Sequence, residues 1–289
     1  MSSQITTAFV EQYSSNVQLL SQQKGSLFRN AVRVESQTGK NAFYDQVGSA
    51  TAQKRMSRHA DTPQIDTPHA RRRVSLVDYE YADLIDDQDK VRTLIDPTSP
   101  YSQATAFAMG RAIDDEIISA AFGTAYTGET GSTSTSFPAG QQVAVGSPAA
   151  GLTVAKLVNA KQILDENNVD PTLPRYCAVA PEQLADLLNI TTVTSSDYNT
   201  VKALVQGEID TFLGFKFIVS NRLSSEAGVN RRVIAWAEDG LLLSIGKDIT
   251  AKIDERADKG YATQVYYSMS IGATRMEEEK VVEIKCRED

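Results

Sequence analysis

The sequence PTSPYSQATAFAMGRAIDDEIISAAFG, residues 97–123, predicts the longest helix of this chain, and the other segments are assigned outward from it. Ser99 is placed to cap the helix N-terminus and Pro100 to occupy its first turn, where a missing amide costs nothing. The run that follows contains one glycine and no proline, and Gly123 stands where a C-terminal cap is expected. A helix of this length extends for roughly 33 Å, which is enough to span a whole domain.

On the N-terminal side of this helix, residues 32–82 are predicted to form strand, extended arm and strand. Apolar and charged residues alternate at both ends, in 32–35 and 77–81, which is typical of strands. The middle contains Asp-Thr-Pro twice, at 61–63 and 66–68, and each proline pushes the preceding threonine towards extended geometry. Because a two-stranded segment of this kind is only marginally stable by itself, we expect another copy of the chain to hold it.

Charge is unevenly placed along the same region. Basic residues dominate from Lys54 to Arg73, and acidic residues dominate from Asp78 to Asp96. Two such blocks form complementary patches that could pair between copies of the chain. Charge alone nevertheless favours the simpler interpretation, in which both blocks are solvated faces that contribute little to stability.

On the C-terminal side of the long helix, the pattern is that of a compact α/β unit. Thr153 is placed to cap a helix and Pro181 to begin another. Apolar runs predict a buried strand at 176–179 and a strand at 212–219. The other elements expected are an amphipathic helix along residues 5–20, a flexible loop or hairpin tip at 127–140, a hairpin of 233–236 with 241–244 around Gly240, and closing strands at 264–269 and 281–286.

Composition and charge exclude several classes of protein. The 289 residues carry 29 Lys+Arg against 37 Asp+Glu, and the formal net charge of −8 argues against a coat that wraps nucleic acid tightly. The chain has no apolar run of about 18 residues and does not start with a basic and apolar leader, so we expect neither a membrane span nor a signal peptide. Its two cysteines, Cys177 and Cys286, fit a reducing cytoplasm rather than a disulfide framework.

No pattern in the sequence predicts catalysis. Residues 240–247, GLLLSIGK, mimic a phosphate-binding loop, but they are one residue too long and Asp248 replaces the hydroxyl that would hold Mg²⁺. The acidic run 114–116 on the long helix is best interpreted as surface charge, with Arg111 within helical reach. We therefore expect no enzymatic activity, no catalytic residue, no metal and no cofactor.

The order of these parts resembles the major capsid proteins of tailed double-stranded DNA bacteriophages, whose fold is named for phage Hong Kong 97. Residues 205–221, VQGEIDTFLGFKFIVSN, are similar to a Gly-x-Ile-x-x-x-Leu-Gly-Phe run of that family, in which Gly214 turns the backbone into a strand. Residues 61–73 resemble the family's extended loop, and the closing strands resemble its last ones. The likeness covers essentially the whole chain.

The resemblance implies an α+β fold with five segments. In the family's terms these are an N-terminal arm at 1–31, an extended loop (E-loop) at 32–82, a peripheral (P) domain at 83–150 with its spine helix at 100–122, an axial (A) domain at 151–245, and closing P-domain strands at 246–289.

The resemblance also implies a structural function: a protein that self-assembles through hexamers and pentamers into an icosahedral head around a double-stranded DNA genome. The expected location is the virion, after assembly in the cytoplasm of the host bacterium. A portal and a separate scaffolding protein are expected partners, because the chain lacks the long cleaved N-terminal extension of the type member, and a cement protein is an optional one. DNA would be enclosed without sequence-specific binding, and no membrane is involved.

Three alternatives stay open at this point. An encapsulin, the shell protein of a bacterial compartment, shares the fold, and a small α/β enzyme would need an acid/base pair that the sequence lacks. A tail or decoration protein would not need the long helix followed by an α/β unit. For the capsid interpretation, we expect the basic E-loop to pair with acidic groups of an adjacent copy. The residues expected at that contact are Arg58, His59, Asp61, Arg71, Arg72, Arg73, Asp83, Asp86 and Asp87.

Overall fold

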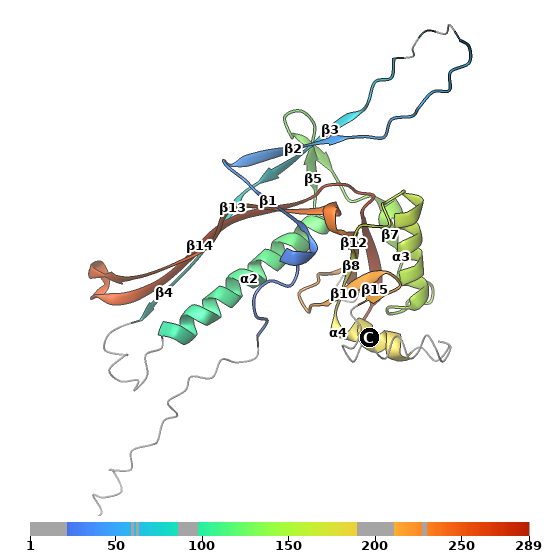
Figure 1. The fold of residues 1–289 in the computed structure, drawn as a ribbon. Helices are drawn as coiled ribbons and strands as arrows, with labels where there is room; N and C mark the ends of the chain where they lie inside the picture. The colour runs from blue at the N-terminus through green and yellow to red at the C-terminus, as the bar shows by residue number, and fades with distance from the viewer. Residues whose placement is uncertain are drawn as a thin grey trace, which may run out of the picture. The chain divides into compact units, whose positions relative to one another are not determined.

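The computed structural model describes residues 22–58, 61, 64–85, 98–189, 211–226 and 230–288 (Figure 1). These residues form an α+β fold with three α-helices and with strands in three sheets. None of the described helices is long and apolar enough to cross a membrane. The amphipathic helix predicted along residues 5–20 lies outside the described residues. The chain divides into two compact units, the first made of Met1–Ser26, Asp78–Arg111 and Lys247–Met269, and the second of Leu27–Val77, Ala112–Gly246 and Ser270–Asp289.

Helix α2 (Thr98–Phe122) is the long helix that the sequence predicts. It begins at Thr98, ahead of the predicted start, so the prediction that Ser99 caps it from outside was wrong. Its C-terminal end is held by Arg275, whose Nη1 donates hydrogen bonds to the carbonyls of Ala121 (2.9 Å) and Gly123 (3.0 Å). A guanidinium at this position satisfies carbonyls that have no partner within the helix and interacts favourably with the helix dipole.

The core of the second unit is a seven-stranded sheet on which helix α3 (Val154–Glu166) packs. Thr153 caps α3 as predicted, because its hydroxyl accepts a hydrogen bond from an amide in the first turn. Trp236 is fully buried between the rings of Phe28 and Tyr176, with centroid distances of 5.8 and 5.7 Å. The strand order is β7–β15–β12–β8–β10–β9, with β11 on β12, and the bounds are β7 (Gln142–Val143), β8 (Arg175–Val179), β9 (Thr211–Phe212), β10 (Phe215–Val219), β11 (Ser225–Glu226), β12 (Asn230–Ala237) and β15 (Val281–Arg287); helix α4 (Pro181–Asn189) follows β8.

The stretch 212–219 is a tight hairpin, so the prediction of one continuous strand was wrong. Strands β9 and β10 pair antiparallel, with Phe212 opposite Phe215. The two residues between them, Leu213 and Gly214, have φ angles of +53° and +85°. Left-handed geometry at both positions reverses the chain within two residues, as in the favoured hairpin turns. The glycine does turn the backbone into a strand, as the resemblance implied.

We expect Gly214→Ala to lower the free energy of unfolding by about 1 kcal/mol, because alanine adopts a left-handed φ only at a cost. The nearest atom to an added Cβ is Nζ of Lys161, 3.9 Å away, so the cost is conformational rather than steric. Gly140→Ala is the matched control, because its Cβ would meet nothing within 4 Å and its φ is not left-handed. Urea unfolding of both variants checks this, and equal midpoints would contradict it.

The predicted hairpin around Gly240 was also wrong. Strand β12 belongs to the seven-stranded sheet, whereas β13 (Leu241–Arg256) belongs to a second, four-stranded sheet. A 3₁₀ turn at Glu238–Gly240 carries the chain from one sheet to the other, where Leu242 lies opposite Arg33 in parallel pairing. Residues 241–247 of the apparent phosphate loop are therefore strand. The order of this sheet is β1 (Arg33–Ser36), β13, β14 (Ala262–Arg275) and β4 (Val77–Ile85).

A third sheet carries the extended excursion of the chain. Its order is β2 (Asn41–Val47), β3 (His69–Ser75), β5 (Ala125–Thr127) and β6 (Thr133–Thr135). The strands predicted at both ends of 32–82 exist as β1 and β4, but they join the four-stranded sheet instead of each other. The hairpin of the excursion is β2 and β3, and β3 was not predicted. We call Asn41–Ser75 the arm and its joining residues 48–68 the arm tip (Figure 1).

Candidate assembly surface

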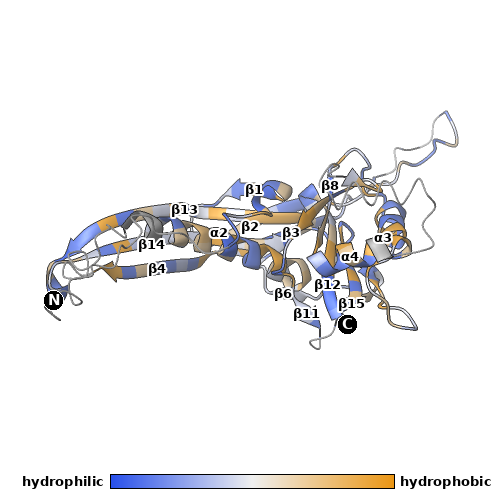
Figure 2. Ribbon diagram, turned by 90° about the horizontal axis from the view of Figure 1, so that it is seen from below, coloured by the Kyte–Doolittle hydropathy of each residue, from blue (hydrophilic) through white to orange (hydrophobic). Residues whose placement is uncertain are grey.

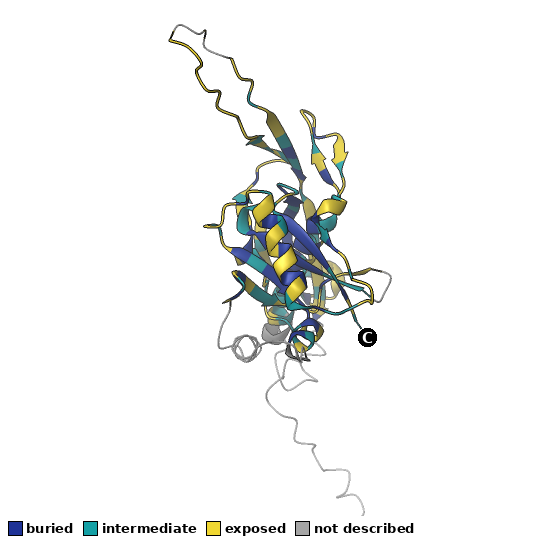
Figure 3. Ribbon diagram, turned by 90° about the vertical axis from the view of Figure 1, so that its right-hand side faces the viewer, coloured by how far each residue is buried: buried dark blue, intermediate teal, exposed yellow. Residues whose placement is uncertain are grey.

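The base of the arm is its two paired strands, β2 and β3, and one face of this pair is exposed. The register of β2 and β3 places Phe43 opposite Arg73 and Asp45 opposite Arg71. Because alternate side chains of a strand share a face, these four lie on one side of the sheet together with Val47. Phe43 is 43% exposed and Val47 is 66% exposed. We call this side the outward face of the arm; Figure 3 shows exposed residues alternating with less exposed ones along its strands.

Two of the predicted contact arginines, Arg71 and Arg73, lie on the outward face, where each packs against an aromatic ring. Arg71 donates from Nε to Oδ1 of Asp45 at 2.5 Å, and its guanidinium lies 5.6 Å from the centroid of the Phe43 ring. This hydrogen bond raises the pKa of Arg71 and lowers the pKa of Asp45. Arg73 stacks over Tyr126, with its guanidinium 4.6 Å from the ring centroid. Charge and aromatic surface are thus presented together.

Arg72 points the other way and is only 5% exposed. Its Nε donates to the carbonyl of Met276 at 2.7 Å, and its Nη2 donates to the carboxylate of Glu278. The same carboxylate lies 3.5 Å from Nε of Arg275. Arg72 therefore anchors strand β3 to the core of its own subunit through these hydrogen bonds. For this reason, we leave Arg72 out of the contact proposed between copies.

A pocket lies beside the outward face at the arm base. It combines apolar side chains with charges of both signs, which suits contact with a mixed protein surface better than with a single ion. Its lining residues are Asp45, Val47, His69, Ala70, Arg71, Thr127, Gly128 and Glu129.

The arm tip is exposed along all of its described residues except one, which is half-buried. Met56 is 88% exposed. Arg55 donates from its guanidinium to the carbonyls of Ser57 and Arg58, which bends the chain there. Arg58 and Asp61, both predicted contact residues, are exposed, and His59 lies outside the described residues.

The acidic residues of the predicted contact are only partly described. Asp83 lies half-buried on β4, where its Oδ1 accepts a hydrogen bond from the amide of Leu84 at 2.9 Å. Asp86 and Asp87 lie outside the described residues. Asp83 belongs to the first unit of the chain, whereas the arm arginines belong to the second.

A comparison with protein families now decides what the chain is. A sequence model described as phage capsid protein matches residues 5–288, nearly the whole chain. The chain belongs to the phage capsid protein family. No curated protein matches this capsid protein by sequence.

Solved capsid structures share the fold of the capsid protein. The capsid of cyanophage P-SCSP1u is 20% identical with a TM-score of 0.74, and the match covers 99% of this chain and 95% of that one. The capsid of Ralstonia phage GP4 is 12% identical with a TM-score of 0.74, covering 98% and 96%. The capsid of an empty GTA particle is 14% identical with a TM-score of 0.68, covering 99% and 98%.

These findings confirm the fold and the structural function that the resemblance implied. The capsid protein has an α+β Hong Kong 97-type fold and is a major capsid protein that self-assembles into the icosahedral shell of a virion. The encapsulin alternative is not favoured, because the family that matches is that of phage capsid proteins.

Sequence reasoning missed a buried carboxylate on the spine helix. Asp114 was interpreted as surface charge paired with Arg111, and this was wrong. Its side chain is fully buried and accepts hydrogen bonds from the amides of Leu27 (3.0 Å) and Phe28 (3.2 Å), while Arg111 donates to the Oε1 of Gln22. The sequence did contain a signal for this burial. The residues three and four positions after Asp114 are apolar, and residues at that spacing share one face of a helix.

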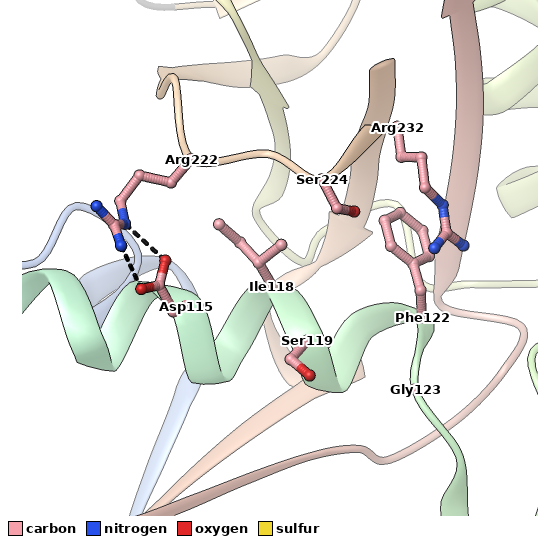
Figure 4. Close-up of a pocket in the computed structure, with 8 residues that line it drawn as sticks. All are labelled: Asp115, Ile118, Ser119, Phe122, Gly123, Arg222, Ser224 and Arg232. Atoms are coloured by element: carbon pink, nitrogen blue, oxygen red, sulfur yellow. Dashed lines mark hydrogen bonds and ion pairs between the residues drawn. The ribbon is translucent and has the colours of Figure 1, made fainter. Parts of the chain in front are cut away.

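A second pocket lies where α2 ends, and Figure 4 shows its lining. Arg222 forms a two-point ion pair with Asp115, with Nε 2.6 Å from Oδ1. Arg232 stacks on Phe122 at 4.0 Å and is paired with the buried Glu283. Each arginine of the pocket is thus matched by a carboxylate of the same chain, so these contacts join α2 to the sheet.

Thiol chemistry and metal binding find no support in the described part of the chain. Cys177 and Cys286 are free and buried. Burial raises the pKa of the Cys286 thiol to about 12, so it stays protonated and unreactive at neutral pH. Within the described residues, His, Cys, Asp and Glu side chains form no group of three that could hold a metal ion.

Proposed function

We propose that the capsid protein assembles through hexamers and pentamers into a closed head that encloses a double-stranded DNA phage genome, and that it catalyses no reaction. Assembly takes place in the cytoplasm of the host bacterium with a separate scaffolding protein and a portal, and a cement protein is an optional partner. The net charge of −8 suits a wall that encloses DNA without holding it tightly.

The observation that carries this proposal is the arm. Its tip exposes Met56 and its outward face exposes Val47 and Phe43. Exposed apolar groups gathered on one projecting hairpin are typical of a surface that another protein covers. In a self-assembling shell, the economical cover is a neighbouring copy.

We propose the same division of the chain that the resemblance implied. The N-terminal arm is 1–31, the E-loop 32–82, the P domain 83–150 and 246–289 with its spine helix at 100–122, and the A domain 151–245. The E-loop contains the arm, and the A domain contains α3, α4 and β8.

We propose that the contact between copies pairs the basic arm with acidic groups of the neighbour. Arg58 and Asp61 at the arm tip are its exposed members, and Arg71 and Arg73 frame its outward face. Asp83 is the described member of the acidic block that the arm is proposed to meet. The set is completed by His59, Asp86 and Asp87, which lie outside the described residues.

The test is to express the capsid protein alone and together with a candidate scaffolding protein of the same phage. Sedimentation and electron microscopy are expected to show closed shells of uniform size, because pairs of arms and neighbours repeat around every hexamer and pentamer. A subunit that stays monomeric in gel filtration under both conditions would overturn the proposal. Shells that hold an enzyme as cargo would overturn the genome-enclosing role.

A further inference from the structure

Strand β4 is an open edge of the four-stranded sheet. It stands last in the order β1–β13–β14–β4, so its outer side pairs with no other strand of the described residues. An edge strand presents a row of backbone donors and acceptors that another strand can use. Both of its faces are accessible, since Val77 and Tyr81 on one face and Leu84 on the other are each about two-fifths exposed or more.

The arm tip contains a segment whose backbone groups also lack partners within the described residues. Residues 49–56 belong to no helix or strand, and all of them are exposed. Within the described residues, none of their backbone groups is hydrogen-bonded to the chain, since the last pair before them joins the amide of Gly48 to the carbonyl of Pro68. The segment contains neither glycine nor proline, and its first four side chains are small.

The two segments match in charge and in length. β4 carries three acidic residues and no basic one, and residues 49–58 carry three basic residues and no acidic one. At about 3.3 Å per residue, residues 49–56 in strand geometry would span roughly 26 Å, and β4 spans roughly 30 Å. Glu80 and Asp83 are the acidic groups that Lys54 and Arg55 of a second copy would meet.

We propose that residues 49–56 of one copy add as a strand to the outer edge of β4 of a neighbouring copy. This inference rests on the proposed self-assembly and specifies the interactions that join two copies. Main-chain hydrogen bonds would provide affinity, and the complementary charges would select the partner strand. Figure 2 shows both hydrophilic and hydrophobic residues along β4, which gives the added strand polar and apolar neighbours.

Backbone pairing has a signature that a contact through side-chain charge lacks. In a strand, the amides of successive residues point to opposite sides, so only every second residue of the added strand bonds to β4. Proline removes an amide donor and is tolerated where that amide faces solvent. Four single variants, Ala50→Pro, Thr51→Pro, Ala52→Pro and Gln53→Pro, therefore form a scan along the segment.

Shell yield by sedimentation is expected to fall about tenfold for one alternate pair, either 50 and 52 or 51 and 53, and to stay at the unmutated level for the other pair. A tenfold change in association corresponds to one hydrogen bond of about 1.4 kcal/mol. The subunit itself should fold equally well in all four variants, because none of these amides is bonded within the described residues. Uniform loss or uniform tolerance of the four would overturn the proposal.

A charge exchange tests the partner. Arg55→Glu and Glu80→Lys are each expected to lower shell yield about tenfold, and the double variant is expected to recover most of it. Additive losses in the double variant would overturn β4 as the receiving strand. If the unmutated protein forms shells while either result fails, only this inference falls; if the unmutated protein forms none, the proposed function falls with it.

Discussion

A capsid protein in which Asn-Gly replaces residues 50–66 is expected to fold as a subunit and to form no shells. The subunit should fold because the described residues removed are all exposed, and because the amide of Gly48 already bonds to the carbonyl of Pro68 at 2.8 Å across the hairpin. Asn-Gly is the favoured two-residue link between antiparallel strands. The hairpin would thus close where its ladder now ends.

Shells should be lost because each copy gives up the surface that meets its neighbour. A loss of about 3 kcal/mol at one contact weakens association about 100-fold, and this loss recurs at every contact of a shell. Sedimentation velocity and electron microscopy measure the shells, and thermal unfolding of the subunit is the control for folding. A melting temperature within about 3 °C of the unmutated subunit, together with normal shells, would contradict the assignment of the arm to assembly.

Arg275→Met is expected to lower the free energy of unfolding of the subunit by about 3–5 kcal/mol, the range for breaking a buried ion pair from one side. Arg275 is fully buried and contacts several neighbours at once. It donates to the carbonyls of Ala121 and Gly123 at the end of α2, and it lies beside Glu278. Its guanidinium also lies 5.1 Å from the centroid of the Phe137 ring.

The variant would leave these carbonyls without their donor and would leave the Glu278 carboxylate to Arg72 alone. Arg256→Met is the matched control, because Arg256 forms its ion pair with the exposed Asp258 and donates one further hydrogen bond to Oε1 of Gln264, so its loss should cost at most about 1 kcal/mol. Arg275→Lys should restore little, since an ammonium cannot span the same acceptors as a planar guanidinium. Denaturant unfolding of the three variants is the measurement, and equal midpoints for Arg275→Met and Arg256→Met would contradict this role.

Strand β3 illustrates why part of the assembly surface escaped sequence reasoning. Its residues, HARRRVS, contain three consecutive arginines, so no alternation of apolar and polar residues marks a strand. Only the pairing with β2 determines which way each arginine points. Arg72 points into the core and donates to Glu278, whereas Arg71 and Arg73 lie on the outward face. Three identical side chains thus acquire two different functions from one register.

The two wrong hairpin predictions have a related cause. Residues 212–219 read as one apolar strand because nothing in the local pattern reports that Leu213 joins Gly214 in left-handed geometry. Residues 233–244 read as a hairpin because both apolar runs flank a turn residue, Gly240. Burial decided otherwise, since Val233 packs in the core of the seven-stranded sheet and Leu242 pairs in parallel with β1.

The sequence by itself determined the long helix, the cap at Thr153, the position of most strands and, through the order of these parts, the capsid fold. These features depend on local causes: helical and strand periods, capping hydroxyls and prolines act within a few residues of one another. Only the tertiary structure decided which strands pair and which arginine is structural. Arg72 meets Glu278 across 206 positions and Trp236 meets Ala31 across 205, and no local pattern encodes contacts that burial selects over such distances.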